Sequence, residues 1–338
     1  MKKENTSYLT NSQTNTLYIL ITGCCGFIGT NLCLKLLKEN KNIIIYGIDN
    51  IINNYNINFK YENLKKLQKY SNFIFNKTNI SNYNINNNIN IVIHLASIPG
   101  VRRSLSEPIL YLDNNVKEYI ILLEKCKKLN IKNIIFASSS SVYGNNISIP
   151  FKEDDILNNI ISPYALSKKC MEIYSKYYSD QYNMNIIGLR FFTVYGPMGR
   201  PDMAPYIFIK NISENKPINK YGNGDSLRDY TYIDDIINGI VLCINKLNNM
   251  SESNYIIYNL GSNNPIKLNK FIELIEKIVN KKAIINKMSN QMGDVKKTYA
   301  DISKAKEELG FKINNSIETG LNKTYLWMKK NNRILLNK

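Results

Sequence analysis

Histidine is nearly absent from this sequence, and its scarcity narrows the possible chemistry. The only histidine among 338 residues, His94, lies inside the apolar run INIVIHLAS. A single histidine between apolar neighbours is typical of a packed strand residue rather than a catalyst. Histidine-based nucleophilic catalysis and zinc binding therefore have almost no candidate residues here, and we predict no metal site.

Cysteine is also sparse, and long apolar runs are missing. The six cysteines contain no C-x-x-C pair and no metal-like spacing, which fits a reducing compartment and structural roles. No apolar run approaches the roughly 20 residues that cross a bilayer, and the polar N-terminus does not resemble a signal peptide. We therefore expect no membrane association and a cytoplasmic location.

Acidic residues are outnumbered, with 27 Asp and Glu against 44 Lys and Arg, giving a formal charge of +17. The lysines are dispersed through helix-like segments instead of forming one basic arm. Specific nucleic-acid binding is therefore disfavoured, although an RNA-binding protein remains an alternative. A small ligand that carries phosphate also suits a positive field.

After position 16, apolar strand-like segments alternate regularly with helix-like segments. Apolar runs typical of strands occupy 17–22, 43–48, 72–76, 90–95, 132–138 and 185–190, and helix-like segments occupy 27–39, 59–69, 108–129 and 164–182. This alternation predicts an α/β protein with a Rossmann-like, doubly wound parallel sheet.

The alternation of strand-like and helix-like segments ends near residue 191, where short elements and loops rich in Gly, Pro and Asn begin. We predict a disordered polar extension over 1–16 and an NAD-binding Rossmann domain over 17–190. A smaller C-terminal α/β region over 191–338, partly interleaved with the first, would bind the substrate at the carboxyl ends of the strands.

A glycine-rich turn follows the first predicted strand. In TGCCGFIGTNL, Gly23, Gly26 and Gly29 directly precede a helix, and Asp49 lies twenty residues later at the end of the second strand. Such glycines permit a tight turn that brings backbone N–H groups near a pyrophosphate. A carboxylate at Asp49 would bind a ribose 2′-hydroxyl and repel a 2′-phosphate, which favours NAD over NADP.

A tyrosine and a lysine at helical spacing follow the fifth predicted strand. Tyr164 and Lys168, in SPYALSKK, share one helix face, and the strand before them ends in FASSSSVYG. A tyrosine with a pKa of about 10 is a poor base at neutral pH. A neighbouring ammonium and a positive nicotinamide ring would favour its phenolate, so the pair is a candidate catalytic centre.

With these features together, the chain resembles the extended short-chain dehydrogenase/reductases, specifically the NAD-dependent nucleotide-sugar epimerases, and within them UDP-glucuronate 4-epimerases. The resemblance runs from about 17 to 330. The segments that carry it are TGCCGFIG, GIDN, HLASIPGVRRSL, ASSSSVYG, PFKEDD, SPYALSKK, LRFFTVYGPMGRPDMA, RDYTYIDDI and GDVKKTYADI.

The resemblance implies roles for matching positions. Tyr164 would be the base, Lys168 its partner and Ser139 the catalytic hydroxyl. The predicted coenzyme-binding residues are Gly23, Gly26, Phe27, Ile28, Gly29, Asp49, Asn50, Asn79, Ile80, Tyr164 and Lys168. The predicted substrate-binding residues are Ser140, Ser141, Thr193, Arg200 and Arg228, of which Arg228 would grip the diphosphate.

The reaction expected from this resemblance is epimerisation at C4 of a UDP-sugar. Dehydratases of the group carry an Asp-Glu pair, and decarboxylases a Glu, where this chain has Ser140 and Ser141. Elimination of water therefore has no evident proton donor. The segment GRPDMA favours a uronate, because Arg200 could pair with its carboxylate, although Arg200 could also simply brace the loop. The expected reaction therefore converts UDP-glucuronate to UDP-galacturonate.

Several alternatives stay open at this point. The chain could act on UDP-glucose or UDP-N-acetylglucosamine, could be a nucleotide-sugar dehydratase, or could bind NAD without catalysis. The resemblance also implies a homodimer formed by the helices predicted at 108–129 and 164–182.

Overall fold

The computed structural model describes residues 16–250, 253–289, 295 and 297–331. The extension predicted over 1–16 lies outside this range except for its last residue. Among the described residues, no helix combines the length and the apolar character needed to cross a bilayer.

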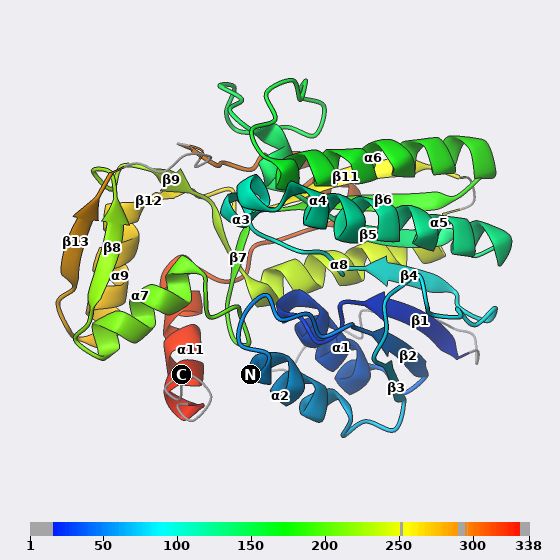
Figure 1. Ribbon diagram of the computed structural model, residues 1–338, viewed down its shortest axis with the longest axis horizontal. Helices are drawn as coiled ribbons and strands as arrows, with labels where there is room; N and C mark the ends of the chain where they lie inside the picture. The colour runs from blue at the N-terminus through cyan, green and yellow to red at the C-terminus, as the bar shows by residue number, and fades with distance from the viewer. Residues whose placement is uncertain (1–15, 251–252, 290–294, 296, 332–338) are drawn as a thin grey trace.

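A seven-stranded sheet forms the centre of the molecule (Figure 1). Its strands are β1 (Leu17–Thr22), β2 (Ile43–Ile48), β3 (Phe73–Asn76), β4 (Ile91–His94), β5 (Asn133–Ser139), β6 (Asn185–Phe191) and β11 (Tyr255–Leu260). They run in the order β3-β2-β1-β4-β5-β6-β11, and every neighbouring pair is parallel. The predicted doubly wound parallel sheet is confirmed, and all six predicted strands are present within one or two residues.

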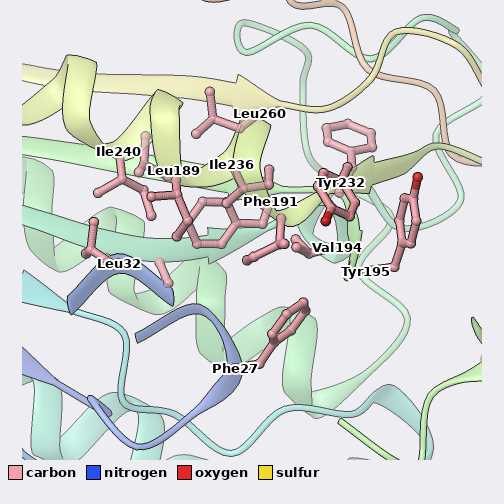
Figure 2. Packing of buried hydrophobic residues seen from close by; sticks show 14 of the residues in the cluster. Phe27, Leu32, Leu189, Phe191, Val194, Tyr195, Tyr232, Ile236, Ile240 and Leu260 are labelled. Atoms are coloured by element: carbon pink, nitrogen blue, oxygen red, sulfur yellow. The ribbon is translucent and has the colours of Figure 1, made fainter. Parts of the chain in front are cut away.

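Helices cover both faces of this sheet, which explains why the strands are apolar on both sides. α1 (Phe27–Glu39), α2 (Asn58–Leu67) and α8 (Ile233–Asn248) pack on one face, where Leu32, Leu189 and Ile240 meet (Figure 2). α5 (Glu118–Lys128) and α6 (Pro163–Tyr182) cover the other face (Figure 1). Burial of isoleucine, leucine and phenylalanine between these layers supplies the main stabilisation.

The helix predicted over 108–129 is interrupted. It consists of α4 (Pro108–Tyr111), a π-helical turn (Leu112–Lys117) and α5. In the π turn, the buried side chain of Asn115 accepts a hydrogen bond from Ile98 N at 2.7 Å and donates to Ser167 Oγ at 3.0 Å. These bonds join the turn to the loop after β4 and to α6, a contact that helical periodicity does not reveal.

The elements of the C-terminal region are shorter and more varied. The strands β7 (Thr193–Tyr195), β8 (Pro217–Tyr221), β9 (Leu227–Arg228), β10 (Tyr230–Tyr232), β12 (Ile266–Lys267) and β13 (Ile284–Met288) form three two-stranded sheets. The helices are α7 (Ala204–Ser213), α9 (Leu268–Val279), α10 (Ser303–Leu309) and α11 (Ile317–Lys330). Figure 1 shows α7, α9, β8 and β13 together beyond one end of the central sheet.

β11 and α8 lie within 191–338 yet belong to the central layers. The domain boundary at 190 and the interleaving of the two regions stay predictions.

Candidate active site

A cavity of about 340 Å³ lies over the carboxyl ends of the central strands. Its lining includes the ends of β1, β2, β5 and β6 and the loops after β3 and β4. The lining residues used below are Gly23, Gly26, Phe27, Ile28, Gly29, Asp49, Asn50, Tyr55, Lys60, Thr78, Asn79, Ile80, Glu118, Ser138, Ser139, Ser140, Ser141, Tyr164, Lys168, Thr193 and Arg200. Ligands of open α/β sheets bind at such an edge.

The glycine turn forms one wall of the cavity. Gly23 has φ +72°, and a Cβ there would lie 2.8 Å from Ala96 N. A Cβ on Gly29 would overlap the Gly23 carbonyl oxygen, so close packing of α1 on the turn requires glycine. At Gly26 a Cβ would meet only Gly23 O, at 3.2 Å. The turn therefore leaves open space for a phosphate to approach the N-terminus of α1, which suits a dinucleotide.

Asp49 is held in place at the end of β2. Its carboxylate accepts hydrogen bonds from Cys25 N at 3.1 Å and Ile51 N at 2.8 Å. Lys60 of α2 donates to the same carboxylate at 3.3 Å, and both side chains are buried. Lys60 is a cavity residue that sequence reasoning missed, because one lysine among many in a helix carries no distinguishing signal.

Asn50 and Asn79 meet at the next part of the wall, where Asn50 Nδ2 donates to Asn79 Oδ1 at 2.8 Å. Asn79 follows β3 and Asn50 follows β2, so parallel pairing of these strands brings the two amides together. Ile80 is buried beside them. All of the predicted coenzyme-binding residues line the cavity.

Tyr164, Lys168 and Ser139 meet where α6 begins beside the end of β5. Ser162 caps α6 by accepting a hydrogen bond from Ala165 N at 3.1 Å, which fixes the turn that carries Tyr164. Tyr164 and Ser139 both line the cavity, and interaction with the Ser139 side chain lowers the pKa of Tyr164. Lys168, one turn later, is buried and donates to Ala137 O at 2.7 Å.

The environment of these two groups moves both pKa values. Burial raises the pKa of Tyr164, while interaction with the Ser139 side chain and the charge of Arg200 lower it. Burial lowers the pKa of Lys168 to about 7. In the protein without coenzyme, burial therefore raises the pKa of Tyr164 more than the other groups lower it. The sequence predicts a lowered pKa, because it counts on a neighbouring ammonium and a bound nicotinamide ring.

The serines after β5 form a short polar ledge. Ser139 Oγ donates to Ser141 Oγ at 3.1 Å and accepts from Ser141 N at 3.2 Å. Ser140 also lines the cavity. Below them Ser138 Oγ donates at 2.6 Å to Glu172, which forms a buried ion pair with Arg190. The ledge is therefore anchored to α6 and β6.

The predicted substrate-binding residues divide into two groups. Ser140, Ser141, Thr193 and Arg200 line the cavity, and Arg228 is not among its lining residues. Arg200 pairs with Asp202 through Nε–Oδ1 at 3.0 Å and Nη2–Oδ2 at 2.5 Å, and its guanidinium lies 6.0 Å from the Tyr55 ring centroid.

Arg228 lies on β9, where its Nη1 donates to Leu227 O at 3.0 Å. Its proposed contact with a diphosphate stays a prediction. Arg228 belongs to the two-stranded sheet of β9 and β12, which is not part of the central sheet. A sequence motif does not show to which sheet its residues belong.

His94 is a packed strand residue, as predicted. It is fully buried, its Nδ1 lies 2.8 Å from Thr22 Oγ1, and burial lowers its pKa to about 3. Among the described residues, no group of three or more His, Cys, Asp and Glu side chains is placed to hold a metal ion.

Comparison with known proteins places this cavity in context. The family model described as "NAD dependent epimerase/dehydratase family" matches residues 19–261. The chain belongs to this family.

Among relatives of the epimerase/dehydratase family, the UDP-glucuronate 4-epimerase of Thermodesulfobacterium geofontis is 42% identical, over 93% of this chain and 97% of the relative. Protein CapI of Staphylococcus aureus is 40% identical, over 91% of this chain and 97% of its own length. A crystal structure of UDP-glucuronic acid 4-epimerase from Bacillus cereus with UDP-glucuronic acid and NAD has a TM-score of 0.87 and 36% identity, and covers 93% of this chain and 99% of that chain.

Proposed function

We propose that this protein is an NAD-dependent 4-epimerase that converts UDP-glucuronate to UDP-galacturonate. One observation carries the proposal: a tyrosine, a serine and a lysine meet in the same cavity as a dinucleotide-type glycine turn. We call the part around Gly23–Gly29, Asp49 and Asn79 the coenzyme end. The part around Ser139–Ser141, Thr193 and Arg200 is the sugar end.

The chain's own residues would handle one proton and one oxygen. Bound NAD supplies the redox chemistry that converts the C4 alcohol transiently to a ketone and back. Tyr164 as phenolate accepts the proton of the 4-hydroxyl and later returns it. Ser139 donates a hydrogen bond to the reacting oxygen, and Lys168 contributes charge near the tyrosine when it is protonated.

One feature supports epimerisation rather than dehydration, and a second supports catalysis. Ser140 and Ser141 line the cavity where a dehydratase needs acidic side chains. The intact Tyr164–Lys168 pair argues against an NAD-binding protein without catalysis. A neutral sugar nucleotide remains the second candidate, because Arg200 is already paired with Asp202 and a neutral substrate does not require it.

Arg200 would distinguish these substrates. Its guanidinium lines the sugar end, and a uronate carboxylate is a bidentate partner for it. The uronate carboxylate would have to compete with the Asp202 carboxylate for the N–H groups of the Arg200 guanidinium. Arg228 would bind the diphosphate from β9, outside the cavity lining.

We also propose a homodimer. Exposed apolar side chains gather on the outer surface of α4, the π turn and α6, namely Ile109, Leu112, Leu166, Ile173 and Tyr177. Leu166, Ile173 and Tyr177 recur at helical spacing on one face of α6. A second copy packed on this face would bury them in a four-helix arrangement. Light scattering tests this, and a monomer would contradict it. The cytoplasmic location stays a prediction.

The function is tested by presenting UDP-glucuronate, UDP-glucose and UDP-N-acetylglucosamine side by side to the purified protein. We expect the 4-epimer of UDP-glucuronate to form fastest, without net consumption of NAD. A clear preference for a neutral sugar would reject the uronate assignment. Formation of a dehydrated product would reject epimerisation.

A further inference from the structure

Lys125 of α5 binds three backbone carbonyls of a single loop. Its ammonium donates to Ile80 O at 2.8 Å, Ser81 O at 2.7 Å and Tyr83 O at 2.8 Å. A lysine has three N–H donors, so all of them have acceptors in this loop. The loop follows β3 and contains no helix or strand, and of these three carbonyls Ile80 O also accepts a hydrogen bond from Tyr83 N at 3.2 Å.

Glu118 supports the same loop from the same helix. It lies seven residues before Lys125, a spacing that places the two side chains on one face of α5. Its Oε2 accepts a hydrogen bond from Ser81 N at 2.9 Å. Ser81 is therefore held at its N–H by a carboxylate and at its carbonyl by an ammonium. We call Glu118 and Lys125 the loop clamp.

The clamped loop is a wall of the coenzyme end. Thr78, Asn79 and Ile80 line the cavity, and so does Glu118 itself. Asn79 also accepts the hydrogen bond from Asn50 at 2.8 Å, which ties the loop to the end of β2 beside Asp49. Ile80, whose carbonyl Lys125 binds, is only 5% exposed. A shift of the loop would therefore move the residues that we assign to the coenzyme.

The positive charge of Lys125 strengthens the hydrogen bonds that hold the loop. Hydrogen bonds in which one partner is ionised are stronger than neutral ones, and Lys125 makes three of them to one short segment. An epimerase whose redox cycle closes within each turnover has no need to exchange its coenzyme. Slow release of NAD suits such a cycle, and a fixed loop provides it.

We propose that Glu118 and Lys125 are positioning residues that fix the loop over residues 79–83 and thereby slow the release of bound NAD. The inference rests on the proposed function, since it requires NAD in this cavity.

The test compares NAD release from wild-type holoenzyme and from Lys125→Met, which keeps the apolar stem and removes all three donors. Bound NAD is chased with isotopically labelled NAD, and the exchange rate is measured by mass spectrometry. We expect exchange from Lys125→Met to be about tenfold faster or more, since the lost hydrogen bonds are charge-assisted. Lys128→Met, which removes an exposed lysine from the same helix, should exchange at the wild-type rate.

A second pair of variants keeps the test decisive if Lys125→Met folds poorly. Glu118→Ala removes the acceptor of Ser81 N, whereas Glu118→Gln retains an oxygen at the same position. We expect faster NAD release and faster amide exchange at Ser81 in Glu118→Ala, with substantial rescue in Glu118→Gln. The thermal midpoint of each variant separates loss of stability from loss of positioning.

The outcomes distinguish the two proposals. If wild-type protein neither contains NAD nor takes it up, the proposed function fails together with the clamp. If the wild type holds NAD but both Lys125→Met and Glu118→Ala release it at the wild-type rate, only the clamp is overturned.

Discussion

At the coenzyme end of the cavity the backbone itself shapes the wall, whereas at the sugar end side chains do so. A Cβ on Gly29 would meet Gly23 and Cys24, a few residues away in the chain, whereas a Cβ on Gly23 would meet Leu95 and Ala96 after β4. The sugar end joins β5, α6 and the segment after β6, and Arg200 takes its position from an ion pair with Asp202. A local motif thus defines the glycine turn, whereas long-range contacts define the sugar end and the rest of the coenzyme end.

The largest effect is expected at the junction of the two ends. Tyr164→Phe removes the proposed base and should lower kcat by roughly a thousandfold or more, because general base catalysis typically contributes two to four orders of magnitude. Binding of NAD and of UDP should persist, as measured by calorimetry. Tyr177→Phe, on the face of the same helix proposed for the dimer and away from the cavity lining, keeps the aromatic ring and should keep its activity. Substantial turnover by Tyr164→Phe would refute the role of this tyrosine.

Two glycines with similar backbone angles test whether the coenzyme end depends on space or on conformation. Gly23 has φ +72° and close neighbours, whereas Gly310 has φ +69° and nothing within 4 Å of the point that a Cβ would occupy. Gly310→Ala should cost about 1–2 kcal/mol of unfolding free energy from backbone strain alone. Gly23→Ala should cost clearly more and abolish NAD binding. Equal losses in chemical denaturation would show that crowding at Gly23 has no effect.

Lys168 predicts a pH dependence of stability in the coenzyme-free protein. Its pKa is about 7 in the fold and near 10.5 when unperturbed. Between these values the unfolded chain binds more protons than the native protein, so the lysine makes unfolding free energy rise with pH. The unfolding free energy of the wild type minus that of Lys168→Met should therefore increase from pH 7 to pH 10. Denaturant titrations at both pH values measure the gap, and a gap that stays constant would contradict the lowered pKa.

The smallest effect is expected from the ion pair at the sugar end. Asp202→Asn releases Arg200, and because exposed pairs contribute about 0.2–1 kcal/mol, KM for UDP-glucuronate should fall by no more than about fivefold. KM for a neutral UDP-sugar should stay unchanged. Steady-state kinetics with both substrates make the comparison, and an equal change for both would assign Arg200 a bracing role only.

The difference between local motifs and long-range contacts also explains which parts of the fold can be predicted from the sequence. The strand–helix alternation, the glycine turn and the helix that carries Tyr164 and Lys168 are encoded by local periodicity and spacing, and the structure contains each of them. The π turn at Asn115 was not predicted, because it depends on Ile98 and Ser167, which are distant in sequence. The addition of β11 to the sheet was missed for a related reason, since its segment lies among irregular loops.

Site residues follow the same rule. The positions of Gly26 and Asp49 beside the cavity were predictable because each follows a strand at a known spacing, and Ser139 was predicted from the family resemblance. Lys60 was not, because only the fold brings α2 against Asp49. Arg228 shows the opposite case, since its motif is local, yet it lies in the small sheet of β9 and β12 and is not among the lining residues of the cavity.

The fate of the hydrogen on C4 tests the central proposal most directly. UDP-glucuronate that carries deuterium at C4 is incubated with the protein in ordinary water, and the product is examined by NMR and mass spectrometry. We predict UDP-galacturonate that retains the deuterium at C4. Loss of the label to solvent, or recovery of the substrate with no inversion at C4, would contradict the proposal.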